Sequence, residues 1–174
     1  MNSQDVILGM LLKGPMSGYD MKQVFQSVFS YFYDASYGTI YPTLSRMEKN
    51  GLITKESVVQ EGKPNKNVYA ITAQGHEMFM QYMHSEIEPE SFRSDLLMRM
   101  FFGEFVGKDV VVGWFEREIV KKEQQYQQLS SGYQEFAQLC SPTKRLCAEY
   151  GMESLAHAIQ FLKKGLREIQ ALEA

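Results

Sequence analysis

The sequence predicts a mainly α-helical protein, and three observations support this prediction. Residues 5–50 contain three short segments whose apolar residues recur at helical intervals. Residues 52–72 contain two short segments rich in β-branched residues, separated by a polar turn. From residue 91 onward the pattern is helical and contains no strand signal. This order predicts an N-terminal winged helix-turn-helix, with three helices and a two-stranded wing, followed by a helical C-terminal region.

The composition is that of an ordinary globular protein of 174 residues, with 44% hydrophobic and 22% charged residues. No segment approaches the about 18 consecutive apolar residues of a membrane span, and we see no signal peptide, so we expect a cytoplasmic protein without membrane contact. The net charge of −3 argues against a protein that is basic over its whole surface. Cys140 and Cys147 supply neither a disulfide framework nor a four-ligand zinc site, so we expect no metal and no cofactor.

The first two helices are short and amphipathic. The run DVILGMLLK from Asp5 predicts a mostly buried helix, which Gly14 and Pro15 end. The second helix begins at Ser17, which has capping-box spacing with Asp20. Its apolar residues recur at helical intervals and are Met21, Val24, Phe25, Val28 and Phe29.

The third helix begins near Gly38 or Thr39 and ends at Asn50 and Gly51. Pro42 is tolerated there because the first amides of a helix have no intrahelical partner. At about 100° per residue, one narrow arc is apolar and faces the core; it consists of Ile40, Leu44 and Met47. The opposite face carries Gly38, Pro42, Ser45, Arg46 and Lys49, with Tyr41 at its flank.

The wing is predicted from Leu52 to Val59 and from Lys66 to Thr72. The polar turn QEGKPN joins the two strands and gives the hairpin an exposed basic tip. Thr72 then caps a further helix that ends before Pro89.

The C-terminal region is predicted to form two long helices that pack as an antiparallel, coiled-coil-like pair. One apolar stripe runs from Val112 to Cys140 and the other from Met152 to Ile169, and the first long helix ends before Pro142. We therefore divide the chain into a DNA-binding domain at 1–88 and a helical dimerisation and effector-sensing domain at 89–174. The dimer interface is predicted to contain Phe115, Ile119, Tyr126, Leu155, Ile159, Leu162, Leu166 and Ile169.

The outward face of the third helix suggests binding to duplex DNA. Small polar side chains and isolated cations can enter the major groove without steric conflict, and arginine is the commonest reader of guanine. We expect Arg46 and Lys49 to contact bases or nearby phosphates, while Gly38 allows close approach of the backbone. The supporting polar contacts are predicted to be Thr39, Tyr41, Thr43 and Ser45.

The wing is predicted to touch backbone phosphate or the adjacent minor groove through Lys63, Asn65 and Lys66. Few phosphates are neutralised by one subunit, so its affinity alone would be modest. A homodimer holding two such helices roughly 34 Å apart would read a pseudo-palindromic operator with higher affinity.

Three sequence motifs resemble the PadR-type transcriptional regulators. They are LGMLLKGPMSGYDMKQVF, YGTIYPTLSRMEKNGLI and VYAITAQG, and IEPESFRSDLLMRMFFG followed by two long helices is similar to the variety with a long C-terminal region. The resemblance covers nearly the whole chain. It implies a homodimeric repressor whose C-terminal helices form the interface and which, in some relatives, an aromatic or phenolic ligand releases from DNA.

A ligand-sensing function would need a cavity next to the dimer interface or between the two domains. Candidate effector contacts are Phe101, Phe102 and Trp114, with methionines as adaptable walls. The alternative is that these side chains only pack in the core or interface, as aromatic residues at helical spacing usually do.

The sequence also bears on two other classes of function, an enzyme and a protein-binding module. His76, His84 and His157 lie far apart in sequence, and the chain has no HExxH, GxSxG or glycine-rich phosphate loop, so we expect no enzyme. A winged helix that binds proteins instead of DNA stays open as the alternative, although the outward Arg46 and Lys49 count against it.

Overall fold

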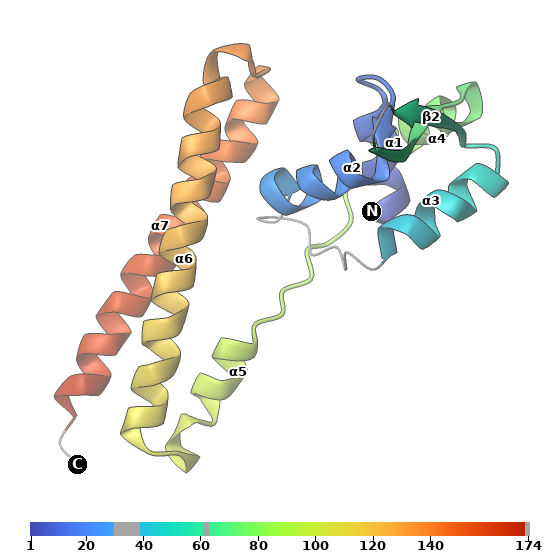
Figure 1. Cartoon of the computed structure of the whole chain (residues 1–174). Coiled ribbons are helices and arrows are strands. Elements are labelled where there is room, and N and C mark those ends of the chain that lie inside the picture. The colour runs from blue at the N-terminus through green and yellow to red at the C-terminus, as the bar shows by residue number, and fades with distance from the viewer. Residues whose placement is uncertain (30–38, 61–62, 173–174) are drawn as a thin grey trace. The chain divides into compact units, whose positions relative to one another are not determined.

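The computed structural model describes residues 1–29, 39–60 and 63–172, and at residues 27, 28, 60, 63, 64, 135, 136 and 139 it describes the backbone alone. The chain forms two compact units, Met1–Glu90 and Ser91–Ala174 (Figure 1). The division expected from composition lies two residues earlier, after residue 88. The fold is mainly helical with one small sheet, which confirms the predicted fold class.

The first unit contains four helices and a small antiparallel sheet among its described residues. In chain order its elements are α1 (Ser3–Leu11), β1 (Met16–Ser17), α2 (Gly18–Val24), the π-helix η1 (Phe25–Phe29), α3 (Ile40–Lys49), β2 (Ile53–Gln60), β3 (Lys63–Ile71) and α4 (Ala73–His84). Gly51, at φ 70°, takes the left-handed conformation that ends α3, as its place after Asn50 predicts.

The sheet has the strand order β1-β3-β2, with both pairings antiparallel. The predicted two-stranded wing is therefore incomplete, because Met16 and Ser17 add a third strand beside Tyr69 and Val68. A strand of two residues shows no alternation, so its sequence carries no periodic signal. The pairing places the start of α2 next to the middle of β3.

The core of this unit is formed by the inward faces of its helices and sheet. Ile40, Leu44 and Met47 are fully buried in it, which confirms the predicted inner face of α3. The buried cluster also contains Ile7, Leu8, Met10, Leu11, Met21, Phe25, Leu52, Ile53 and Tyr69.

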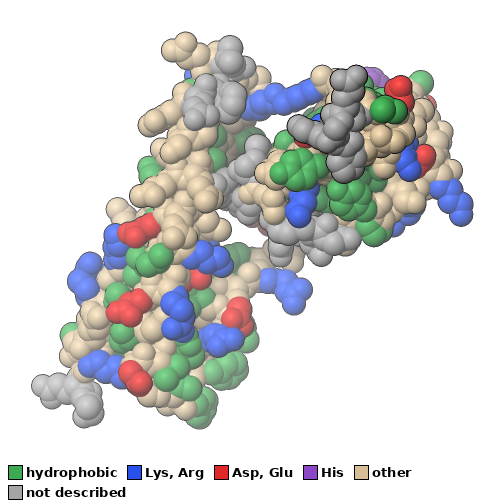
Figure 2. Space-filling model, in the orientation of Figure 1, with side chains coloured by type: hydrophobic (Ala, Val, Ile, Leu, Met, Phe, Trp, Pro, Cys, Tyr) green, Lys and Arg blue, Asp and Glu red, His purple; other side chains and the backbone are tan. Residues whose placement is uncertain are grey.

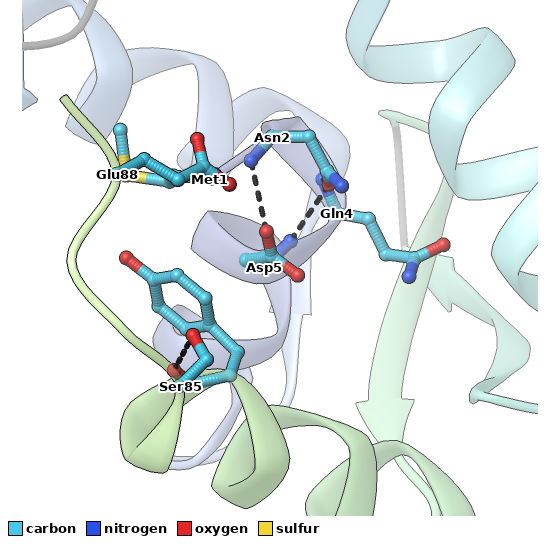
Figure 3. A network of polar contacts seen from close by, with 7 residues as sticks. Met1, Asn2, Gln4, Asp5, Ser85 and Glu88 are labelled. Atoms are coloured by element: carbon cyan, nitrogen blue, oxygen red, sulfur yellow. Dashed lines mark hydrogen bonds and ion pairs between the residues drawn. The ribbon is translucent and has the colours of Figure 1, made fainter. Parts of the chain in front are cut away.

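Polar side chains satisfy free amides at the starts of α1 and α4. Asn2 Oδ1 accepts hydrogen bonds from the backbone amides of Gln4 and Asp5, and Asp5 Oδ2 accepts one from the Asn2 amide at 2.8 Å (Figure 3). In α4, Thr72 Oγ1 accepts from the Gly75 amide at 3.0 Å. These caps fix where α1 and α4 begin, and both helices belong to the compact unit that contains α3.

The second unit is built on two long helices. Its elements are α5 (Asp95–Phe101), the 3-10 helix η3 (Gly103–Phe105), α6 (Lys108–Phe136), the 3-10 helix η4 (Ala137–Leu139) and α7 (Pro142–Ala171). Pro142 is at the start of α7 behind the N-cap Ser141, which confirms the predicted end of the first long helix.

Helices α6 and α7 lie side by side and run antiparallel (Figure 1). Lys163 Nζ of α7 lies 2.6 Å from Glu123 Oε1 of α6, and Lys108 at the start of α6 donates a hydrogen bond to the Gln170 carbonyl near the end of α7. Charged side chains of both signs are spread over the outside of this hairpin (Figure 2). None of the helices in the described part of the chain has a stretch long and apolar enough to cross a membrane.

The predicted dimer interface needs correction, because four of its residues form the core of this hairpin. Phe115, Ile119, Leu155 and Leu162 are all at most 8% exposed within a single chain. Leu166 and Ile169 are partly buried against the same cluster. Tyr126 and Ile159 are half-buried. A stripe at heptad spacing predicts that a helix is covered, but it does not say whether the covering helix belongs to the same chain.

Candidate nucleic-acid interface

Helix α3 presents one polar face to solvent while its other face lies in the core. Ser45, Arg46 and Lys49 are exposed, as are Thr39 and Tyr41. Since residues 42, 45, 46 and 49 recur three and four apart, their side chains form one continuous stripe along the helix. Gly38, which was predicted to allow close approach of DNA, lies outside the described residues.

Thr43 does not belong to this stripe, although the sequence analysis placed it among the DNA contacts. Its side chain is only 5% exposed and faces the core. It lies three residues after Ile40 and four before Met47, so helical geometry puts it on the buried side. Its polarity, rather than its spacing, led to the wrong prediction.

Tyr41 is held at the flank of α3 by the first residue of α2. A Cβ atom on Gly18 would lie 2.8 Å from the Tyr41 ring, so this contact exists only because Gly18 has no side chain. The Tyr41 side chain is still 56% exposed. Its ring therefore packs at one edge while the residue remains accessible, as predicted for a flanking contact.

The wing brings further polar side chains to the first unit. Asn65 is exposed on β3, and Lys66 beside it is half-buried. For Lys63 the structure describes the backbone, which forms the first residue of β3 opposite Gln60. All three predicted wing residues thus lie in the strand itself and not in the turn.

An ion pair that could not be predicted from the sequence joins the wing to α2. Lys66 Nζ lies 3.0 Å from Asp20 Oδ2, and both side chains are about two-fifths exposed (39% and 43%). The hydrogen bond from Lys66, followed by that from Ser17, lowers the pKa of Asp20 below its ordinary value. Sequence spacing shows Asp20 only as the capping partner of Ser17, because the register of β3 against β1 cannot be read from it.

A shallow groove in the second unit contains two of the three predicted effector contacts. It has a volume of about 380 Å³, is open to solvent and is lined by Met98, Arg99, Phe102, Phe105, Val106 and Trp114. The Arg99 guanidinium lies 5.9 Å from the centre of the Trp114 ring, a cation–π distance. Phe101 is not part of the lining; it is 77% exposed and packs edge-on against Phe102.

The described residues contain no cluster of three or more His, Cys, Asp or Glu side chains that could hold a metal ion. The three histidines are spread over α4 and α7. What the first unit presents instead is an exposed helix face beside a β-hairpin, and this arrangement defines a winged-helix protein with a helical C-terminal unit.

Comparison with known proteins identifies the family. The model described as "Transcriptional regulator PadR-like family" matches residues 7–81. A PadR-like transcriptional regulator of known structure from Bacillus cereus is 40% identical, with 97% of this chain and 96% of that chain covered and a TM-score of 0.88. The chain therefore belongs to the PadR-like family of transcriptional regulators, which confirms the resemblance seen in the motifs. This is a family of regulators and not of enzymes, in agreement with the prediction against catalysis.

Two further relatives extend the comparison. A protein of known structure from Streptococcus mutans is 40% identical, with 96% of this chain and 99% of that chain covered and a TM-score of 0.92. The negative transcriptional regulator PadR of Bacillus subtilis is 25% identical over 147 residues, which are 83% of this chain and 80% of that protein. Bacillus subtilis PadR in complex with operator DNA shares the fold at 24% identity, with 95% of this chain and 98% of that chain covered and a TM-score of 0.78. Its complex with p-coumaric acid shares the fold at 20% identity, with 97% of this chain and 96% of that chain covered and a TM-score of 0.67.

Proposed function

We propose that this chain is a sequence-specific regulator that binds double-stranded DNA as a homodimer and represses transcription. The observation that carries the proposal is the exposed face of α3, where Ser45, Arg46 and Lys49 are open to solvent while the inner face of the helix is buried in the core. Side chains of these types can form hydrogen bonds with base edges and phosphates in the major groove. The Bacillus subtilis relative, a negative regulator, has been solved with operator DNA, which supports the same role here.

The charge near this face is only slightly positive. Between Tyr41 and Asn67 the sequence has five cations (Arg46, Lys49, Lys55, Lys63 and Lys66) and three anions (Glu48, Glu56 and Glu61), an excess of two. Few phosphates are therefore neutralised by one subunit. Tight and selective binding to an operator therefore requires two subunits on the same operator.

The surface for dimerisation is proposed to lie among the apolar side chains that the second unit leaves exposed. Figure 2 shows hydrophobic side chains gathered around α5 and the start of α6. Large apolar side chains grouped in this way on a surface usually mark an interaction site. Those exposed there are Leu97, Met98, Phe101, Phe102, Phe105 and Val110.

A small aromatic acid is proposed as the effector. The groove is lined by three aromatic side chains, Phe102, Phe105 and Trp114, and Arg99 supplies a cation that can bind a carboxylate. The relative from Bacillus subtilis binds p-coumaric acid, a molecule with both features. Trp114 is the chain's single tryptophan, so p-coumarate bound in the groove would change its fluorescence. Arg99→Gln is expected to lower the affinity for p-coumarate measured by this fluorescence change. An unchanged affinity would mean that the groove is not the effector site.

The DNA-binding proposal is tested with a labelled duplex from the region upstream of the chain's own coding sequence. Fluorescence anisotropy is measured for this duplex and for one of the same composition in shuffled order. We expect tighter binding to the upstream duplex, with both affinities falling as salt rises. Equal binding to the two duplexes would contradict sequence-specific recognition, and no binding to either would favour the protein-interaction alternative.

A further inference from the structure

The ion pair between Lys66 and Asp20 joins the wing to the start of α2. The pairing of Ser17 with Val68 holds this end of α2 against β3, two residues from Lys66. The sheet therefore holds the backbones of Asp20 and Lys66 within reach of each other, and Lys66 Nζ lies 3.0 Å from Asp20 Oδ2.

Asp20 is the fixed member of the pair. Its Oδ2 accepts hydrogen bonds from the Ser17 hydroxyl at 2.8 Å and from the Ser17 amide at 3.4 Å. The hydrogen bond from Lys66 and then those from Ser17 lower the pKa of Asp20 below its ordinary value. Lys66 has a flexible four-carbon side chain and can move away from a carboxylate that cannot follow.

An exposed ion pair of this kind is weak, because water and salt screen it. A DNA phosphate can therefore displace Asp20 from Lys66. When it does, the carboxylate is left next to the phosphate backbone, where it repels the phosphates and attracts a cation from solution. Uptake of that cation opposes the release of counterions that drives binding to DNA.

Resting on the proposed DNA-binding function, we infer that Asp20 lowers the affinity of the wing for DNA by competing with phosphate for Lys66. The sequence shows Asp20 as a helix cap, and the structure gives it this second role. Asp20 makes the sequence-independent part of binding weaker, so recognition by α3 accounts for a larger share of the total affinity.

The test is a double-mutant cycle of Asp20→Asn and Lys66→Gln. Anisotropy is measured over a range of salt with the upstream duplex and with its shuffled counterpart. Asp20→Asn is expected to tighten binding to both by a similar factor, roughly two- to fivefold per subunit, and to steepen the salt dependence by up to about one ion. In the Lys66→Gln background the same change is expected to tighten binding clearly less, because the lysine for which Asp20 competes is gone and only the direct repulsion between Asp20 and phosphate remains.

Three further variants separate charge from folding. Asp20→Gln keeps a capping-box side chain without the charge and is expected to behave like Asp20→Asn. Ser17→Ala removes the capping hydroxyl but keeps both charges, and it is expected to lower the melting temperature without changing the salt dependence. Asp95→Asn removes an exposed carboxylate that pairs with Arg99 in the second unit, and it is expected to leave DNA affinity unchanged.

The possible failures are distinguishable. If the wild-type chain binds the upstream duplex selectively and Asp20→Asn binds equally or more weakly, Asp20 does not compete for Lys66 and the inference is wrong. The inference is also wrong if Ser17→Ala or Asp95→Asn tightens binding as much as Asp20→Asn does, or if Lys66→Gln leaves the effect of Asp20→Asn intact. If the wild-type chain binds neither duplex, it is the proposed function that fails.

Discussion

At the scale of single residues, helical spacing separates the side chains of α3 better than their polarity does. The positions of Ile40, Leu44 and Met47 could be predicted because apolar residues three and four apart share one face. Thr43 has the same spacing and is also buried, yet its hydroxyl suggested an outward role. The contact between Gly18 and Tyr41 could not be predicted, because it depends on how α2 and α3 pack.

Arg46 gives the most direct residue-scale prediction for the proposed interface. Arg46→Ala should weaken binding to the upstream duplex and relax selectivity at one base pair of each half-site, by about 1–3 kcal/mol. The measurement is a competition assay against duplexes with single base changes.

Arg167→Ala is the matched control, since Arg167 is exposed on α7 in the second unit. It removes the same charge and should leave selectivity unchanged. If Arg46→Ala lowers the affinity for all duplexes equally, Arg46 contacts phosphate and not a base.

Asp20 gives a prediction about stability and pH. Its folded-state pKa is lower than the ordinary value of 3.8, so the ionised carboxylate stabilises the fold at neutral pH. This stabilisation is lost as the pH falls below 3.8 through the lowered pKa. The difference in unfolding free energy between wild type and Asp20→Asn should therefore shrink over that range. Urea unfolding followed by circular dichroism at several pH values measures it, and a difference independent of pH would contradict the assignment.

At the scale of elements, segments with a local periodic or capping signal could be predicted and segments without one could not. Helix α3, the wing and the break at Pro142 all had local signals in the form of periodicity, turn residues and proline. Strand β1 has two residues and no such signal. The stripes of α6 and α7 and their antiparallel packing could be predicted, but the surface for dimerisation could not, because heptad spacing does not show whether a stripe is covered by the same chain or by a partner.

Substitutions at two glycines test the packing of α6 on α7. A Cβ atom on Gly165 of α7 would lie 2.7 Å from the Phe115 ring, which is 2% exposed and has no room to move. Gly165→Ala should therefore destabilise the second unit, because overpacking costs about 1–3 kcal/mol and the helix propensity of alanine returns at most about 1 kcal/mol.

Gly132→Ala on α6 is the matched control. Nothing lies within 4 Å of the Cβ atom it would add, so it should stabilise the helix by up to about 1 kcal/mol. Chemical unfolding followed by Trp114 fluorescence reports on this unit. Equal effects of the two substitutions would mean that α6 and α7 are not in close contact at Phe115.

At the scale of the whole molecule, the two units carry different parts of the proposed function. The exposed face of α3 belongs to the first unit, and the apolar residues proposed for dimerisation belong to the second. The need for a dimer followed from the small charge excess of one subunit. The residues of the dimer surface could not be predicted from heptad spacing, because the apolar residues at that spacing pack between α6 and α7 of a single chain.

Two substitutions in the second unit should have different outcomes. Phe101 is 77% exposed, so Phe101→Glu should keep the helical content and shift the chain toward a monomer in light scattering. Leu162 is 4% exposed in the α6–α7 core, so Leu162→Asp should reduce the helical content itself by burying a charge. A Phe101→Glu variant that stays dimeric at all concentrations would place the interface elsewhere.

The measurement that tests the central claim most directly is a hydroxyl-radical footprint of the wild-type chain on the upstream duplex. Two copies of α3 held by a symmetric dimer should protect two half-sites whose centres lie about one helical turn, 10–10.5 base pairs, or a multiple of it apart. Arg46→Ala should weaken the protection of both half-sites equally. A single unsymmetrical protected segment, or protection that Arg46→Ala leaves unchanged, would contradict the claim that paired α3 helices read the DNA.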